Sequence, residues 1–179
     1  MCDIPYLAAV GSLMYVSMAT HPDITYAMNK LGQFNSNPGL PHWTVVQQVL
    51  HYLKQTHNHA LMLGSMQEIC LTGYMDSDFA GCTNTRHSTS GYIFTLGNGP
   101  IYWSLKQQTL VTISTCEAEY VVSCHTMKET IWLRCLLKIL SHKQSTTTIH
   151  SENASSIALM KDTTFHMCSK HIDIQFHYT

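Results

Sequence analysis

Charge is the property that this sequence has least of. Asp, Glu, Lys and Arg make up 12% of the 179 residues, against about 25% in ordinary globular domains. Arginine occurs only as Arg86 and Arg134, and the formal net charge is −1. This balance excludes a strongly basic protein that binds nucleic acid through bulk charge. It also excludes a disordered chain, because 45% of the residues are apolar.

Long apolar runs and paired cysteines are missing as well. The longest apolar stretch, about residues 6–19, is shorter than the roughly 20 residues of a membrane span. A signal peptide has Lys or Arg before its apolar stretch, whereas no Lys or Arg precedes this one. The seven cysteines are odd in number and contain no C-x-x-C pair, so a disulfide framework is not expected. We expect a protein of the cytoplasm or the nucleus that is neither secreted nor bound to a membrane.

Three common site chemistries also lack their motifs. Cys116 and Cys124 fall within a predicted helix and have no paired base, which argues against a cysteine protease. The glycines of residues 97–99 form a hairpin turn and not a phosphate-binding loop. The His and Cys residues near the C-terminus match no common zinc spacing: His166, Cys168, His171 and His177.

The first third of the chain has helical periodicity. Apolar side chains recur every three or four positions, and we interpret these stripes as core packing. The stripes are Leu7, Val10, Met14 and Met18, then Ile24, Met28, Leu31 and Phe34, then Trp43, Val46, Leu50 and Leu53. The pattern predicts a small helical segment over residues 1–62.

From about residue 63 the periodicity changes to that of strands and helices in a mixed order. Residues 69–76, 92–96 and 101–105 are strand-like, and residues 97–100 join the last two as a hairpin. A long helix is expected at about 115–140, a Thr-rich strand at 146–151 and a short helix at 154–160. This order predicts a mixed α/β sheet over residues 63–179.

Four of the eleven acidic residues stand where predicted elements begin or end. Asp76 ends a strand, Glu117 opens the long helix, Glu152 ends the Thr-rich strand, and Asp173 lies in the tail. Carboxylates at one edge of a sheet repel each other unless cations lie between them, and oxygen ligands favour magnesium or manganese. A pair of such ions would support hydrolysis of a phosphodiester.

Each of these acids also has a purely structural interpretation. Glu117 fits an S-x-x-E capping box with Ser114. Asp76 suits a turn near Gly81, Glu152 suits a solvated junction, and Asp173 suits a helix cap. The residues by themselves leave these alternatives open.

Ordered motifs throughout the chain resemble one family. They are HPDITYAMNKLGQF at 21–34, HWTVVQQVLHYLK at 42–54, GYMDSDFAG at 73–81, RHSTSGYIF at 86–94, IYWSLKQQ at 101–108, STCEAEY at 114–120, HSENASSIALM at 150–160 and SKHIDIQFH at 169–177. The chain resembles the end of the Pol polyprotein of copia-type LTR retrotransposons. In that family the last part of reverse transcriptase is followed by ribonuclease H.

The resemblance implies an α/β, ribonuclease H-like fold with a mixed five-stranded sheet and flanking helices. It assigns residues 1–62 to a helical reverse transcriptase fragment, without polymerase activity, and 63–179 to the ribonuclease H domain. The implied reaction is cleavage of the RNA strand of RNA–DNA hybrids with Mg²⁺, or Mn²⁺. The implied catalytic residues and metal ligands are Asp76, Glu117, Glu152 and Asp173, with Glu119 a less favoured alternative to Glu117. Partners would be the hybrid and the remainder of Pol.

Hybrid recognition would use phosphate and 2′-hydroxyl contacts near this site. Arg86, Ser88, Thr89 and Lys106 are the candidates, and their alternative is ordinary solvated loop residues.

One departure from the family motif affects the expected activity. The family has Asp at the position of Glu152, so the carboxylate here is one methylene further out. Two-metal sites depend on sub-ångström placement, and we therefore expect reduced activity. Alternatives are a catalytically silent remnant, a passive hybrid-binding module or a domesticated interaction protein.

Overall fold

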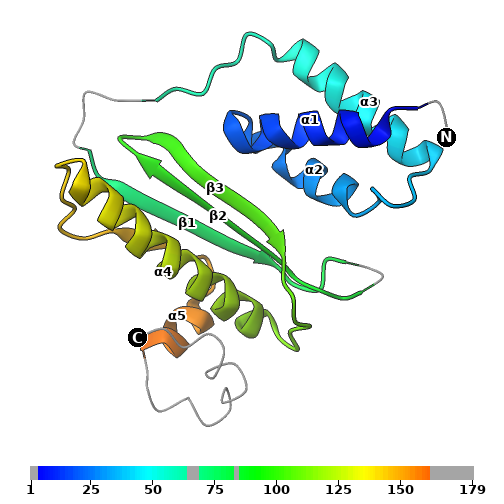
Figure 1. The fold of residues 1–179 in the computed structure, drawn as a ribbon. Helices are drawn as coiled ribbons and strands as arrows, with labels where there is room; N and C mark the ends of the chain where they lie inside the picture. Colours follow the sequence, from blue (N-terminus) through cyan, green and yellow to red (C-terminus); the bar gives the residue numbers. More distant parts are fainter. Residues whose placement is uncertain (1–3, 64–68, 83–84, 162–179) are drawn as a thin grey trace. The chain divides into compact units, whose positions relative to one another are not determined.

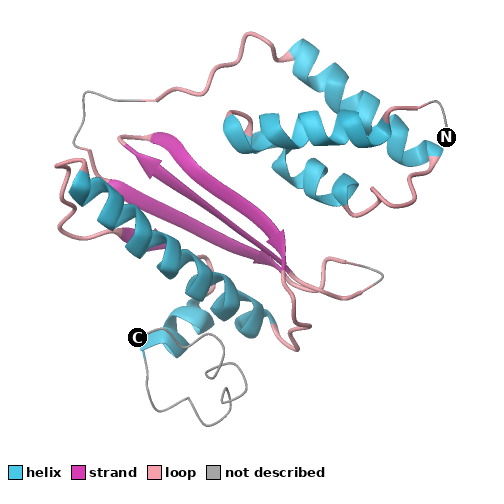
Figure 2. Ribbon diagram, viewed as in Figure 1, coloured by secondary structure: helices cyan, strands magenta, loops and turns pink. Residues whose placement is uncertain are grey.

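The computed structural model describes residues 4–63, 69–82 and 85–161. The chain divides into two compact units, Met1–Met62 and Leu63–Thr179. Among the described residues, the first unit has helices joined by loops, and the second combines a sheet with helices (Figure 2). No helix within the described residues is long and apolar enough to cross a bilayer.

The first unit is built from four helical segments. They are α1 (Tyr6–Ala19), the 3-10 helix η1 (Pro22–Ile24), α2 (Thr25–Gly32) and α3 (Leu40–Gln55). Pro22 opens η1, where its fixed φ suits a first helical position and its missing N–H costs nothing. The backbone N–H of Gly39 donates to Nδ1 of His42 at 2.9 Å, which satisfies a donor at the start of α3.

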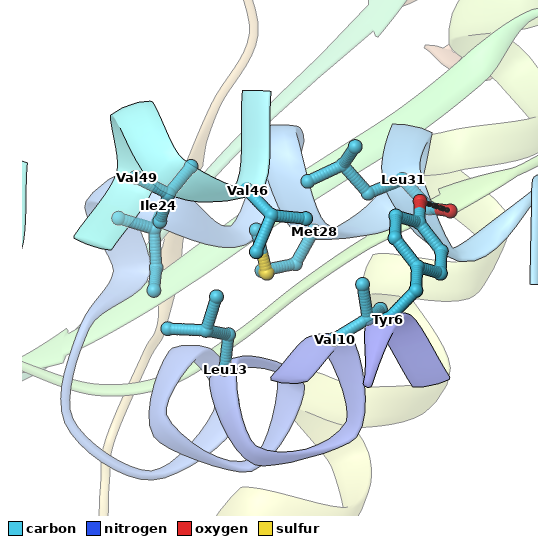
Figure 3. Packing of buried hydrophobic residues seen from close by; sticks show 8 residues of the cluster. All are labelled: Tyr6, Val10, Leu13, Ile24, Met28, Leu31, Val46 and Val49. Atoms are coloured by element: carbon cyan, nitrogen blue, oxygen red, sulfur yellow. Dashed lines mark hydrogen bonds between the residues drawn. The ribbon is translucent and has the colours of Figure 1, made fainter. Parts of the chain in front are cut away.

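A core of eight buried side chains holds these helices together (Figure 3). They are Tyr6, Val10, Leu13, Ile24, Met28, Leu31, Val46 and Val49. The predicted inward face of α1 is wrong in part, because Leu7 and Met18 are 64% and 72% exposed. Apolar residues surround α1 on nearly every side, so its periodicity does not determine which side packs inward.

The second unit contains one mixed sheet. Its strands are β1 (Leu71–Asp78), β2 (Thr89–Leu96), β3 (Gly99–Gln107) and β4 (Thr148–His150), in the order β3-β2-β1-β4. Neighbours pair antiparallel except β1 and β4, which are parallel. The mixed α/β class is therefore confirmed. The prediction of five strands is wrong for the described chain, which has four and passes from β4 into helix α5 (Ala154–Lys161).

The long helix α4 (Thr115–Ile139) packs against one face of this sheet (Figure 1). Leu133 and Leu137 of the helix form a buried cluster with Leu71 and Phe94 of the strands. The β2–β3 turn has positive φ at Gly97 and Asn98, the conformation that tight hairpins require. Burial alternates along β1, as expected for a strand with one covered face.

Candidate acidic site between strand β1 and helix α4

Asp76 and Ser77 lie near the C-terminal end of β1 and point to opposite faces of the sheet. Leu71, Gly73 and Met75 are buried, whereas Asp76 is exposed. Because side chains alternate along a strand, Ser77 shares the covered face with these buried residues. The strand thus presents a carboxylate and a hydroxyl side by side, one to solvent and one to helix α4.

Glu117 forms part of the N-terminal cap of α4. The Ser114 hydroxyl accepts a hydrogen bond from the Glu117 backbone N–H at 3.1 Å. The Glu117 carboxylate accepts one from the Ile113 backbone N–H at 2.7 Å through Oε2. These bonds satisfy two donors at a helix start, where negative charge is also favoured. The capping interpretation of Glu117 is thus confirmed, with Ile113 in place of Ser114 as the backbone donor.

Glu119, two residues further along, turns its carboxylate to the strand. Its Oε1 accepts hydrogen bonds from the Ser77 hydroxyl at 2.9 Å and the Ser77 backbone N–H at 3.1 Å. The Glu119 residue is only 6% exposed. Its Oε2 is buried and has no hydrogen-bond partner among the described residues.

Burial raises the pKa of Glu119 above its usual value of 4.5. The two hydrogen bonds from Ser77 oppose this shift because they favour the charged carboxylate. The negative charges of Asp76 and Glu152 raise the pKa further. An acid on strand β1 and one in the loop after β4 therefore both affect the ionisation of Glu119.

Of the remaining two predicted acids, Glu152 and Asp173, the structure describes only Glu152. Glu152 is exposed in the short segment between β4 and α5. Its neighbour Asn153 caps α5, since Asn153 Oδ1 accepts from the Ser156 backbone N–H at 3.1 Å. Asp173 lies outside the described residues. Over residues 4–63, 69–82 and 85–161, no three Asp, Glu, His or Cys side chains gather closely enough to hold a metal ion.

The chemistry of the acidic residues nevertheless fits a divalent cation. A carboxylate oxygen buried without a hydrogen bond is costly, and a cation is one means of satisfying it. Asp76 and Glu152, whose charges act on Glu119, would add carboxylate oxygens, the ligands that Mg²⁺ and Mn²⁺ prefer. Asp76 and Glu119, with Glu152 at the adjacent strand end, are the described residues suited to this role.

The four residues predicted to contact a hybrid separate into two exposed and two buried side chains. Arg86, in the β1–β2 loop, and Lys106, on β3, are exposed. Ser88 is fully buried and Thr89 is 4% exposed. The Ser88 hydroxyl bonds to Thr112 Oγ1 at 2.7 Å and accepts from the Ala80 backbone N–H at 3.1 Å. The Ser88 hydroxyl is thus hydrogen-bonded inside the second unit.

A buried amide connects the sheet to the same turns of α4. The Gln108 side-chain NH₂ donates to Ser90 Oγ at 2.9 Å and to the Ala118 carbonyl at 3.0 Å. Ser90 lies directly opposite Ser77 in the β1–β2 ladder. Sequence reasoning did not identify Ser77 or Gln108. The only available signal was the position of Ser77 beside Asp76, and no sequence pattern indicated Gln108.

Comparison with known proteins gives relatives along nearly the whole chain. The Retrovirus-related Pol polyprotein from transposon TNT 1-94 of Nicotiana tabacum is 41% identical over 178 residues, 99% of this chain and 13% of that protein. The corresponding polyprotein from transposon RE2 of Arabidopsis thaliana is 38% identical over 174 residues, 97% of this chain and 12% of that protein. Secreted RxLR effector protein 161 of Plasmopara viticola is 40% identical over 133 residues, 74% of this chain and 94% of that protein.

The chain therefore spans only about an eighth of the two polyproteins. No family model matches the chain, and neither does any solved structure.

Proposed function

Because the chain belongs to the copia-type, retrovirus-related Pol polyproteins of transposons, we propose that residues 63–179 are a ribonuclease H domain. Its reaction would be metal-dependent cleavage of the RNA strand of an RNA–DNA hybrid. Residues 1–62 would be the helical end of the preceding reverse transcriptase. The partners would be the hybrid and the remainder of the Pol polyprotein.

The observation that carries this proposal is the contact between the end of β1 and the first turns of α4. Asp76 is adjacent in sequence to Ser77, and Ser77 holds the Glu119 carboxylate by two hydrogen bonds. The Glu119 carboxylate is thereby held close enough to Asp76 for the charge of Asp76 to raise its pKa, and its buried Oε2 has no hydrogen-bond partner among the described residues. A buried carboxylate with a raised pKa is more typical of a functional site than of a helix cap.

We assign the helix ligand to Glu119 and not to Glu117. The Glu117 carboxylate bonds to a backbone N–H of its own helix cap, whereas Glu119 faces the strand that carries Asp76. The full ligand set of the proposal is therefore Asp76, Glu119, Glu152 and Asp173. When bound, Mg²⁺ supplies activation of water and neutralises charge on the phosphodiester. The chain's own part is to hold the carboxylates in position.

Substrate contacts would come from the exposed side chains near the sheet. Arg86 and Lys106 offer positive charge to phosphates, whereas Ser88 and Thr89 support the loop from inside. With only ten Lys and Arg residues in the chain, we expect weak, salt-sensitive binding of the hybrid.

The decisive experiment is cleavage of a labelled RNA–DNA hybrid in Mg²⁺ and in Mn²⁺. Asp76→Asn is the blank, because it removes a carboxylate charge while keeping size. We expect the wild type to release RNA fragments and Asp76→Asn to release none. Cleavage equal in both proteins would assign the activity to a contaminant. No cleavage in either metal would reject the ribonuclease proposal.

A catalytically silent remnant that binds hybrids passively is the second candidate. It is favoured by the absence of a cluster of three metal-binding side chains within the described residues. A thermal-shift titration separates the two, because an ion that binds only the folded state raises the unfolding temperature. We expect a rise with Mn²⁺ in the wild type and a smaller one in Asp76→Asn. Hybrid binding without any rise would favour the remnant.

A further inference from the structure

Ser77 gives both of its polar hydrogens to a single oxygen atom. Its hydroxyl lies 2.9 Å and its backbone nitrogen 3.1 Å from Oε1 of Glu119. Two donors converging on one carboxylate oxygen restrain rotation of the carboxylate about its terminal bond. The other oxygen, Oε2, is then the one left buried without a hydrogen bond from the described residues.

The same turns of α4 are held a second time, through the backbone. Gln108 donates to the carbonyl of Ala118, the residue directly before Glu119. The backbone position and the side-chain orientation of Glu119 are therefore set by two different residues, Gln108 directly after β3 and Ser77 on β1. Among the described residues, Ser77 is the one that donates hydrogen bonds to the carboxylate itself.

We propose that Ser77 is a positioning residue that reserves Oε2 of Glu119 for a divalent cation. The inference rests on the proposed function and deepens it, since it names the residue that orients the helix ligand. By occupying Oε1, Ser77 leaves the buried Oε2 as the oxygen of Glu119 that a cation would bind. Residues that orient a metal ligand typically affect metal affinity 10- to 100-fold.

The chain contains a matched control for this role. Ser90 lies opposite Ser77 in the β1–β2 ladder and is also a serine of the sheet. Its hydroxyl accepts from Gln108, and no bond joins it to Glu119 among the described contacts. Ser90→Ala therefore deletes the same group from the neighbouring strand without touching the carboxylate.

The test is titration of the full chain with Mn²⁺. Calorimetry and the unfolding temperature report the binding, so the test does not depend on cleavage activity. We expect Ser77→Ala to weaken Mn²⁺ binding by about 10- to 100-fold. Ser77→Thr, which keeps the hydroxyl, should restore wild-type affinity. Ser90→Ala removes a bond to Gln108 but none to the carboxylate, so it should weaken the affinity by much less than Ser77→Ala. Unfolding in a chelator checks that each variant is folded. If Ser77→Ala does not fold, Ser77→Cys takes its place, because a thiol is a weaker donor of similar size.

The outcomes separate this inference from the proposed function. Mn²⁺ binding that Glu119→Gln abolishes and Ser77→Ala leaves intact would overturn the positioning role alone. Equal losses in Ser77→Ala and Ser90→Ala would also overturn it, because the effect would be one of packing. A wild type that binds no Mn²⁺ would overturn the proposed function and this inference together.

Discussion

Glu119 and Ser77 are separated by 42 positions, yet they share two hydrogen bonds to one carboxylate oxygen. The contact joins the first turns of α4 to the end of β1. It places a buried carboxylate beside the exposed Asp76, with Glu152 near enough to affect its ionisation. The acid that faces the strand is thus the second glutamate of the STCEAEY motif, while the first caps the helix.

The raised pKa of Glu119 predicts a pH-dependent stability in the absence of metal. A carboxyl whose pKa is higher in the folded state stabilises the fold below its ordinary value, here 4.5. That contribution is lost as the pH rises through the raised pKa. The unfolding free energy of the wild type should therefore fall, relative to Glu119→Gln, as the pH increases above about 4.5.

Urea denaturation in EDTA at several pH values between 4 and 7.5 measures this difference. Glu129→Gln, a half-buried position on the same helix, controls for the loss of one negative charge. Parallel pH curves for the wild type and Glu119→Gln would contradict the prediction.

Substitution of Glu117 should reduce stability, whereas substitution of Glu119 should reduce activity. Glu117→Gln weakens the cap of α4, and we expect a loss of about 0.5–2 kcal/mol in unfolding free energy with cleavage retained. Glu119→Gln should abolish cleavage without lowering stability at neutral pH. Denaturation and hybrid cleavage on the same two preparations provide the measurement. If Glu117 were essential for cleavage and Glu119 were not, the metal ligand on the helix would be Glu117.

A methyl side chain should destabilise the fold at Gly73 but not at Gly91 on the adjacent strand. A methyl group at Gly73 would lie 3.0 Å from Cε1 of Phe94, whose ring is fully buried. Overpacking of this kind costs about 1–3 kcal/mol. At Gly91 the nearest atom would lie at 3.8 Å, an ordinary contact, so Gly91→Ala should be neutral or slightly stabilising. Thermal unfolding of both variants tests the contrast, and equal midpoints would refute it.

Gln144 should be a large contributor to the stability of the second unit. Its Oε1 accepts from the Leu71 backbone N–H at 2.9 Å, and its NH₂ donates to the carbonyls of Ile69 and His142 at 3.0 and 3.2 Å. Gln144→Ala leaves the buried Leu71 N–H at the start of β1 without its partner, together with the two carbonyls. We expect a loss of about 1–3 kcal/mol, the cost of an unsatisfied buried group.

The matched control for Gln144 is Gln107→Ala. The Gln107 side chain makes an exposed bond to Thr85 at 3.4 Å, so its loss should change stability by less than about 0.5 kcal/mol. Chemical denaturation at neutral pH compares the two variants. Similar losses for both would show that the Gln144 bonds add little.

The secondary structure was largely predictable because its signals are local. Alternation of apolar residues located β1, the glycines of residues 97–99 located the β2–β3 turn, and Ser114 marked the start of α4. The inward face of α1 was not predictable, since its apolar residues surround the helix. The role of Glu119 was also beyond local reasoning, because it depends on a strand residue 42 positions away.

The sequence by itself determined the family, the alternation of strands and helices in the second unit, and the acids available for a site. Motif order and periodicity are properties of the chain, and they need no tertiary contact to be read. Only the tertiary structure decided which glutamate meets the strand and which caps the helix. Glu117 and Glu119 have the same chemistry and lie two positions apart, which is about 200° around a helix. Packing of α4 on the sheet turns one carboxylate to the cap and the other to Ser77.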